Sequence, residues 1–445
     1  MASTRIYRTA GTPTLNTKHT ISMWFKRTKL TYGDCFLMDG YVDANNRFKL
    51  AFDSSDRLEL YNTHGGSYKY NVRTNRVFRD TAAFYHLVIR IDTTQASASD
   101  RVRVYVNGTE EESFHTYTDA TQDDANNVVN ESGATISIGD FQGGGNAFEG
   151  LMAHVHFVDG TSYAPTTFGE TDSTSGIWVP KTSPSVTYGN NGFFLKFENE
   201  GDMDLDSSGN GHTFTTSGSL TQNVDTPTNN FAVLNSLYYT TTSGTLSFAG
   251  RNFTKASSVN RSCFSTLAAH AGKYYCEVKV FNDTDCKLGI VNLSYDYNLN
   301  GQTVDFAASG GAYSYNENGQ KQVAGASATS YGDGYNADDI IGIAMDLDNS
   351  KLYFSLNGVF QDSGDPTSGS TGTGAISIAA GGDYAFAGKV NGGCNLGFNF
   401  GSGDYSTSSS VASSNADDNG IGSFEYDVPA GYYALCTKNI RDFGG

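Results

Sequence analysis

The sequence predicts an all-β protein built from two β-sandwich (jelly-roll) domains. Two stretches far apart in the chain, residues 85–108 and 338–360, share one hairpin pattern in which apolar residues alternate with small or polar ones before an Asn-Gly pair. Alternation with a period of two places the apolar side chains on one face of a strand, and Asn-Gly favours a tight turn at the strand end. The length of 445 residues is too great for one ordinary core and fits two domains of about 200 residues.

The composition supports a β-rich fold and argues against two classes of protein. Aromatic residues make up 13% of the chain, prolines number only 7, and no amphipathic helical run of three turns is present. No apolar run approaches the roughly 20 residues of a membrane helix, which argues against membrane insertion. Residues 1–11 lack the apolar core of a secretion signal, so we expect synthesis in a cytoplasm.

The charge is acidic overall and unevenly distributed. The net charge of −18 argues against nucleic acid as the main partner. Of the 29 basic and 47 acidic residues, 16 and 9 lie in residues 1–108, so this part carries +7 and the remainder −25. Either the N-terminal region docks on an acidic partner or the surface composition has drifted. The docking interpretation assigns the contacts to five basic residues: Arg5, Arg8, Lys26, Arg27 and Lys29.

The first domain is expected over residues 1–200 and begins with a polar, basic N-terminal arm. Short alternating segments then recur about every 8 to 12 residues, which is typical of a β-sandwich. In the segment 148–160, His154 and His156 share the polar face, and we expect an exposed pair of imidazoles because no third metal ligand is evident. His86 precedes a core strand and is expected to be structural. The expected strands are 20–26, 35–38, 48–52, 58–61, 87–91, 102–106, 134–141, 148–160 and 193–197.

A linker and a second domain follow. Residues 201–235 are dominated by Gly, Ser, Thr, Asn and Asp, which predicts an interdomain linker. The second domain is expected over residues 236–445, with Ile341, Ile343 and Met345 on the core face of its hairpin. Its other expected strands are 246–249, 272–281, 287–292, 394–401 and 430–440.

Two ordered sets of motifs resemble known domain families. In the first half, YHL before RIDTTQ, the RVYVNG strand, ISIGDF and FEGLMAHVHFVDG resemble a laminin G-like, concanavalin A-like jelly roll. In the second half, GKYYCE, LGI, IGIAMD with NGV, NFG and PAGYY follow one another as in a SPRY domain. These resemblances imply a concanavalin A/laminin G-like sandwich followed by a SPRY-like sandwich.

A narrower resemblance covers residues 1–235. The strings YRTAGTP, ISMWFKR, GIWVPK, YGNNGFFLKFEN, DSSGNGH and DTPTNNFAVLN are similar to large virion proteins of tailed phages from marine environments. The resemblance implies a structural virion protein, in capsid decoration, a head fibre or a tail fibre, made in the host cytoplasm and forming homo-oligomers. Its expected partners are other virion proteins and host-surface polysaccharide. A receptor-binding lectin at a tail-fibre tip and a glycosidase remain alternatives.

Alternating carboxylates after the first domain suggest two kinds of site. Glu200, Asp202 and Asp204 would share one face of a strand, as the Glu-x-Asp-x-Glu carboxylates of some concanavalin A-like glycosidases do. The third residue is Asp and the segment is rich in Gly and Asp, so we expect no enzyme activity. Asp202, Asp204 and Asp206 could instead hold calcium, as laminin G-like domains often do, or form a hydrogen-bonded turn.

Four tyrosines of the second domain are the candidate ligand contacts. They lie among Gly, Asn and Asp, a mixture of flat aromatic faces and adaptable polar groups that suits glycan or protein binding. Ordinary composition of long loops in a Tyr-rich chain explains the pattern equally well. The four are Tyr313, Tyr315, Tyr331 and Tyr335.

The six cysteines have no spacing typical of a metal site. They lack CxxC and Cys/His patterns, which argues against zinc. With no export signal evident, we expect buried free thiols rather than a disulfide framework. The cysteines are Cys35, Cys263, Cys276, Cys286, Cys394 and Cys436.

Overall fold

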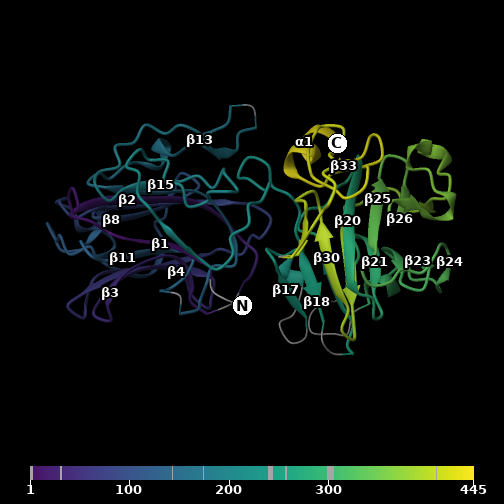
Figure 1. Ribbon diagram of the computed structural model, residues 1–445, viewed down its shortest axis with the longest axis horizontal. Helices are drawn as coiled ribbons and strands as arrows, with labels where there is room; N and C mark the ends of the chain where they lie inside the picture. The colour runs from purple at the N-terminus through teal and green to yellow at the C-terminus, as the bar shows by residue number, and fades with distance from the viewer. Residues whose placement is uncertain are drawn as a thin grey trace. The chain divides into compact units, whose positions relative to one another are not determined.

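The computed structural model describes residues 4–444 except 31–32, 143, 174, 239–243, 256–257, 298–304 and 407. The described chain is nearly all β, as predicted, and divides into two compact units, Met1–Thr228 and Asn229–Gly445 (Figure 1). Each unit is a β-sandwich with its own hydrophobic core. The predicted N-terminal arm is a sheet strand over Arg5–Thr9, because its backbone pairs with two neighbouring strands; residues 1–3 of the arm lie outside the described residues.

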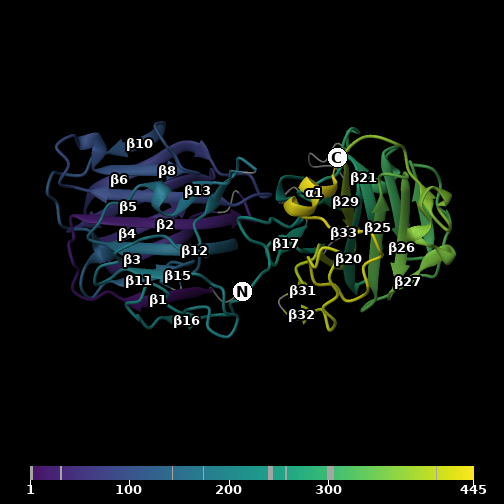
Figure 2. The same cartoon turned by 90° about the horizontal axis from the view of Figure 1, so that it is seen from above.

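Two antiparallel sheets form the first unit, and Figure 1 shows them as two layers. Within the described residues the larger sheet has eight strands, in the order that Figure 2 shows: β10 (Phe114–Thr118), β6 (Ser67–Val77), β5 (Arg57–His64), β4 (Asn46–Phe52), β3 (Cys35–Asp43), β11 (Thr135–Ile138), β1 (Arg5–Thr9) and β16 (Thr215–Ser217). The described strands of the smaller sheet are β15 (Phe193–Leu195), β12 (Gly150–Asp159), β2 (Lys18–Arg27), β7 (Tyr85–Asp92), β8 (Val102–Val106) and β9 (Thr109–Glu110).

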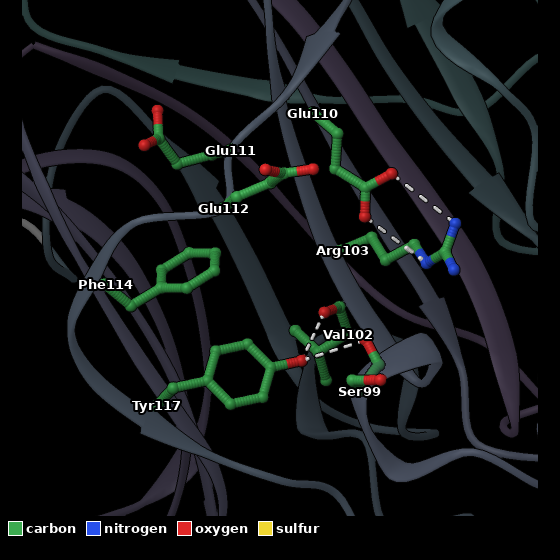
Figure 3. Close-up of a pocket in the computed structure, with 8 residues that line it drawn as sticks. All are labelled: Ser99, Val102, Arg103, Glu110, Glu111, Glu112, Phe114 and Tyr117. Atoms are coloured by element: carbon green, nitrogen blue, oxygen red, sulfur yellow. Dashed lines mark hydrogen bonds and ion pairs between the residues drawn. The ribbon is translucent and has the colours of Figure 1, made fainter.

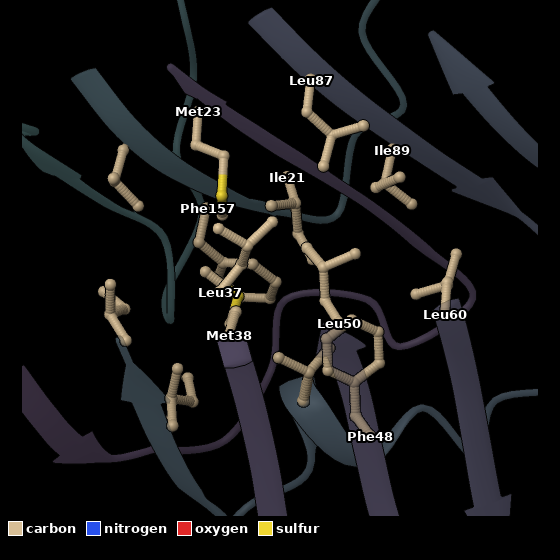
Figure 4. Close-up of a cluster of buried hydrophobic side chains, with 14 of the residues drawn as sticks. Ile21, Met23, Leu37, Met38, Phe48, Leu50, Leu60, Leu87, Ile89 and Phe157 are labelled. Carbon is tan, nitrogen blue, oxygen red and sulfur yellow. The ribbon is translucent and has the colours of Figure 1, made fainter. Parts of the chain in front are cut away.

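The core of the first unit lies between these sheets. Ile21 and Met23 of β2 are fully buried in one cluster with Leu50 of β4 (Figure 4). The alternation predicted for the first hairpin is confirmed, because Leu87 and Ile89 of β7 belong to the same buried cluster. Every second side chain in these parts of β2 and β7 therefore faces the larger sheet, as the alternating apolar pattern predicts.

A covering segment, residues 160–191, buries the outer face of the smaller sheet. Phe168 and Tyr188 of this segment pack against Val88 and Val158 in a separate apolar cluster. The segment includes the two-stranded sheet of β13 (Gly169–Thr171) and β14 (Trp178–Pro180), and Figure 1 shows β13 outside the smaller sheet. The outward face of the smaller sheet is therefore covered around Val88 and Val158, and His86 and His156 on this face lie in the interior.

Most of the predicted linker, residues 201–235, belongs to the first unit, and the boundary follows Thr228. β16 pairs with β1, and the buried carboxylate of Asp206 accepts hydrogen bonds from three backbone N–H groups. Asp225 is buried beside Lys26, with its Oδ2 2.8 Å from the Lys26 Nζ. A Gly-, Ser- and Asp-rich composition predicts flexibility, but here hydrogen bonds hold the segment to the sandwich.

Two sheets also form the second unit. The described strands of the larger sheet run β17 (Thr245–Ser247), β18 (Asn252–Thr254), β30 (Asn395–Asn399), β20 (Lys273–Asn282), β25 (Ile340–Asp346), β26 (Lys351–Leu356) and β27 (Val359–Phe360), with β28 (Ile376–Ser377) on β26 and β33 (Tyr433–Ala434) on β20. The other sheet runs β19 (Arg261–Phe264), β29 (Tyr384–Val390), β21 (Lys287–Asn292), β22 (Ala312–Asn316), β23 (Gln320–Val323) and β24 (Thr329–Ser330). β31 (Asp404–Ser406) pairs with β32 (Ser409–Ser410), and α1 spans Thr437–Phe443. Among the described residues, no helix combines the length and the apolar character needed to cross a membrane.

The hairpin predicted in the second unit is confirmed. Ile343 of β25 pairs with Phe354 of β26, and both are fully buried. Met345 is also fully buried in this core. Asn357 and Gly358 have φ angles of 48° and 82°, the left-handed region that the Asn-Gly pair predicts.

The cysteine prediction is wrong for one pair. Cys286 and Cys394 form a disulfide, with Cα atoms 6.2 Å apart and a sequence separation of 108. Cys286 directly precedes β21 and Cys394 directly precedes β30, so the pairing depends on the fold and cannot be inferred from spacing. The other four are buried free thiols, as predicted: Cys35, Cys263, Cys276 and Cys436.

Candidate binding pocket

A pocket of about 290 Å³ lies where the chain passes from the smaller to the larger sheet of the first unit. Among the described strands, β9 lies at one edge of the smaller sheet and β10 at one edge of the larger sheet. The short connection between these two strands forms one wall of the pocket. Figure 3 shows two aromatic rings on one side of the pocket and an arginine on the other. The lining residues are Ser99, Val102, Arg103, Glu110, Glu111, Glu112, Phe114 and Tyr117.

A β-bulge creates the aromatic side of the pocket. Residues three apart on a regular strand point to opposite faces, but the register of β10 against β6 shifts between Phe114 and Thr116. The rings of Phe114 and Tyr117 therefore lie together, with centroids 4.9 Å apart and planes tilted by 48°. Tyr117 donates its hydroxyl to the Val102 carbonyl at 2.7 Å. Burial raises the pKa of Tyr117 to about 12, so the hydroxyl stays a donor and the ring is fixed.

Two of the three consecutive glutamates are held by arginines. Arg103 Nε lies 3.4 Å from Glu110 Oε1, and the same guanidinium donates to Asp100 at 2.6 Å. Arg76 donates to the buried Glu111 at 2.5 Å. Glu112 is exposed, and within the described part of the chain no basic side chain pairs with it.

This arrangement is suited to binding a small polar molecule. Carboxylates accept hydrogen bonds from hydroxyl or ammonium groups, and ring faces pack against the apolar faces of a ligand. Hydrolysis of a glycoside would instead require two carboxyl groups on either side of the bond, one of them available as an acid. Glu110 and Glu111 are instead each engaged by an arginine.

The sequence did not single out this pocket. Three consecutive glutamates followed by two aromatic residues three positions apart, Phe114 and Tyr117, were the available signal. The bulge that brings the rings together depends on pairing with β6, about 40 residues earlier in the chain, which local patterns do not reveal.

The structure gathers the four candidate tyrosines, but inside the core of the second unit. The ring centroids of Tyr315 and Tyr335 are 5.3 Å apart, and those of Tyr315 and Tyr331 are 5.5 Å apart. Tyr313, Tyr315, Tyr331 and Tyr335 are 4%, 0%, 6% and 1% exposed, so the prediction of ligand contacts is wrong. Tyr313 and Tyr315 are two residues apart on β22, so both side chains point into the core. The sequence pattern did not predict this strand, because the residues around it are polar.

The candidate calcium ligands do not converge. The segment from Glu200 to Asp206 forms turns, so its alternating carboxylates do not share the face of a strand. Asp204 accepts a hydrogen bond from Thr216, and Asp206 is used by backbone amides. Across the described residues, no group of three or more His, Cys, Asp or Glu side chains is placed to hold a metal ion, Asp202 included.

The structure contradicts two of the five basic residues predicted to dock a partner, and it shows the contacts of the other three within the first unit. Lys26 and Arg27 are fully buried and pair with Asp225 and Asp56 of the same unit. Arg8 donates to the Asn191 carbonyl at 3.0 Å. Lys29 Nζ lies 2.5 Å from Glu149 Oε1, and Arg5 stacks on the Tyr7 ring at 4.2 Å. These cations hold the first sandwich together.

The histidines on the outward face of the smaller sheet are also interior. His156 is 1% exposed and hydrogen-bonds the Tyr188 hydroxyl at 2.8 Å, so the prediction of an exposed pair with His154 is wrong. The covering segment supplies these partners. His86 is structural, as predicted: its Nδ1 accepts from the Trp178 indole at 2.9 Å, and its Nε2 lies 2.9 Å from the Ser22 hydroxyl.

Comparison with known proteins agrees with this architecture. Residues 3–168 match the family model described as the concanavalin A-like lectin/glucanases superfamily, in its laminin G form. Residues 273–381 match the SPRY domain model. No curated protein sequence matches the chain.

Similar solved structures include SPRY domains and one sugar-binding domain. The SPRY domain of human HERC1 is 11% identical, with a TM-score of 0.28, over 35% of this chain and 91% of that one. The TRIM65 PSpry domain is 13% identical, with a TM-score of 0.30, over 38% and 88%. Domain 4 of AbnA, an extracellular GH43 arabinanase from Geobacillus stearothermophilus solved with arabinotriose, is 21% identical, with a TM-score of 0.25, over 34% and 64%. By its two family matches, this chain carries a laminin G-like domain of the concanavalin A-like type followed by a SPRY domain.

Proposed function

We propose that this chain is a non-enzymatic structural protein of a tailed-phage virion that binds a host-surface glycan through its laminin G-like domain. The observation that carries glycan binding is the pocket beside β10, where the fixed rings of Phe114 and Tyr117 face carboxylates. Ring faces stack on the C–H faces of sugars, while carboxylates accept hydrogen bonds from sugar hydroxyls. The family match of this domain to lectins and glucanases supports the same class of ligand.

Binding without hydrolysis fits the pairing of the pocket carboxylates. Glu110 is held by Arg103 and Glu111 by Arg76, so both carboxylates are already engaged by arginine. Hydrolysis would need two carboxyl groups placed to act on either side of a glycosidic bond. The pocket therefore favours a lectin over the glycosidase alternative.

The virion setting is supported by the sequence strings within residues 1–235 that are similar to those of tailed-phage virion proteins. In this proposal the SPRY domain binds another virion protein, and the chain assembles as a homo-oligomer in capsid decoration, a head fibre or a tail fibre. A receptor-binding tail-fibre tip is the second candidate, because the same pocket would serve attachment there.

A glycan array tests the binding proposal directly. The full chain should bind a subset of immobilised glycans, and Tyr117→Ala should abolish that binding because it removes half of the aromatic side. Tyr68→Ala is the matched control, since Tyr68 is 56% exposed on the same unit and does not line the pocket. Circular dichroism would verify that both variants fold. Equal binding by Tyr117→Ala and the wild type would contradict the assignment of the pocket.

The location is tested on particles. An antibody against the recombinant chain should label purified virions of the phage that encodes it, and the labelled position distinguishes the capsid from the tail tip. Light scattering of the recombinant chain measures its oligomeric state. Purified virions that lack the chain would refute the virion role without affecting the glycan result.

A further inference from the structure

The charges around the pocket do not cancel. Its lining contains three carboxylates, those of Glu110, Glu111 and Glu112, and a single guanidinium, that of Arg103. Arg76, outside the lining, neutralises Glu111. After these pairs are formed, the carboxylate of Glu112 is left as an uncompensated negative charge at the pocket among the described residues.

The arginine of the pocket is already paired with two carboxylates. Arg103 donates to Asp100 at 2.6 Å and lies within 3.5 Å of both carboxylate oxygens of Glu110. Asp100 is the main cause of the raised pKa of Arg103, with Tyr105 and Glu110 contributing, and the two carboxylates engage part of its donor groups. A sugar carboxylate or phosphate entering the pocket would meet a net negative field, and it would have to share the Arg103 donors with Asp100 and Glu110.

The aromatic side also favours a positive charge. The faces of the Phe114 and Tyr117 rings carry partial negative charge, and such a face attracts a nearby cation. Figure 3 shows Glu112 beside Phe114, on the side of the pocket where Glu110 also lies. Aromatic rings and an uncompensated carboxylate therefore border the same small space.

We propose that the pocket selects a single sugar unit that carries a free, protonated amino group. This inference rests on the proposed glycan binding and names the class of sugar. The ammonium group would donate to the Glu112 carboxylate and lie against the rings of Phe114 and Tyr117, while the sugar hydroxyls bond the remaining acceptors. A pocket of about 290 Å³ lies at the small end of ligand sites, which fits one monosaccharide rather than a longer chain.

Matched sugars test the selection by isothermal titration calorimetry on the full chain. Glucosamine should bind about fivefold more tightly than glucose or N-acetylglucosamine, because an exposed ion pair and a cation–π contact together supply a factor of this size. Glucuronate should bind more weakly than glucose. The preference for glucosamine should weaken as salt is added, since an exposed charge pair is screened.

One variant isolates the charge. Glu112→Gln keeps the size of the side chain and should reduce the ratio of glucosamine affinity to glucose affinity to about twofold or less. Glu170→Gln is the control, because Glu170 is an exposed glutamate of β13 in the same unit, outside the pocket lining. The same charge change there should leave the preference intact.

The outcomes separate this inference from the proposed function. Equal affinity for glucosamine and glucose, or a full preference retained by Glu112→Gln, would overturn the amino-sugar selection and leave glycan binding standing. If no glycan of any charge bound, in these titrations or on the array, both would be overturned.

Discussion

Acid should destabilise the first unit through His86, and the size of the effect follows from its surroundings. The imidazole stacks on Trp24 with centroids 4.6 Å apart, and its Nδ1 accepts a hydrogen bond from the Trp178 indole. Protonation at Nδ1 would place two donors face to face. Burial, with a smaller contribution from His154, lowers the pKa of His86 to about 3, against an ordinary value of about 6.5.

The folded state therefore contains His86 as a neutral imidazole, and the stability that this form contributes is complete above about pH 6.5. Each pH unit below that value costs about 1.4 kcal/mol until the folded pKa is reached. Between pH 6.5 and pH 4.5, His86 alone should lower the free energy of unfolding by about 3 kcal/mol.

Urea unfolding followed by tryptophan fluorescence measures this loss. The two tryptophans of the chain, Trp24 and Trp178, both contact His86, so the signal reports on this site. His86→Asn cannot titrate, and its side-chain oxygen can still accept from the indole. Between pH 7 and pH 4.5 the wild type should lose about 3 kcal/mol more than the variant. Other histidines titrate in both proteins and cancel in this difference, so equal losses would refute the reasoning.

Further predictions concern buried charges and the disulfide. Lys26→Met should lower the free energy of unfolding by about 3–5 kcal/mol, because it leaves Asp225 buried without its ammonium partner. Adding Asp225→Leu should restore much of this loss. If urea titrations showed that the losses from the two substitutions add, the reasoning would be wrong. Glu277→Ala should destabilise the second unit by about 3 kcal/mol in calorimetry, since this buried carboxylate accepts from two tyrosine hydroxyls, one asparagine amide and two backbone amides. An unchanged transition would count against that role. Replacing Cys286 and Cys394 by serine should lower the stability of the second unit by about 2–5 kcal/mol while leaving the tryptophan-detected transition of the first unit in place.

Local patterns predicted the hairpins because the information for them is local. The alternation around Ile343 sets which face is apolar, and the Asn357-Gly358 pair sets the turn, so neither depends on distant residues. The order of the two sandwiches followed in the same way from motifs that each lie within a few strands.

Burial of polar groups could not be predicted, because it depends on partners far away in sequence. Lys26 is buried only because Asp225, 199 residues later, neutralises it. His156 is interior because the covering segment brings Tyr188 over the strand. The tyrosines at 313–335 have polar neighbours in sequence and apolar neighbours in space. In each case, residues of a type usual on a protein surface are covered by another segment of the chain.

The covering segment has a consequence for protein engineering. Its Trp178 indole hydrogen-bonds the imidazole of His86, and its Tyr188 hydroxyl hydrogen-bonds that of His156. The covering segment and the sheet below it are therefore joined through specific polar atoms. A transplant of residues 160–191 alone onto another jelly roll would leave the Trp178 indole and the Tyr188 hydroxyl without their hydrogen-bond partners. Chimaeras should therefore exchange β7, β12 and this layer as one cassette.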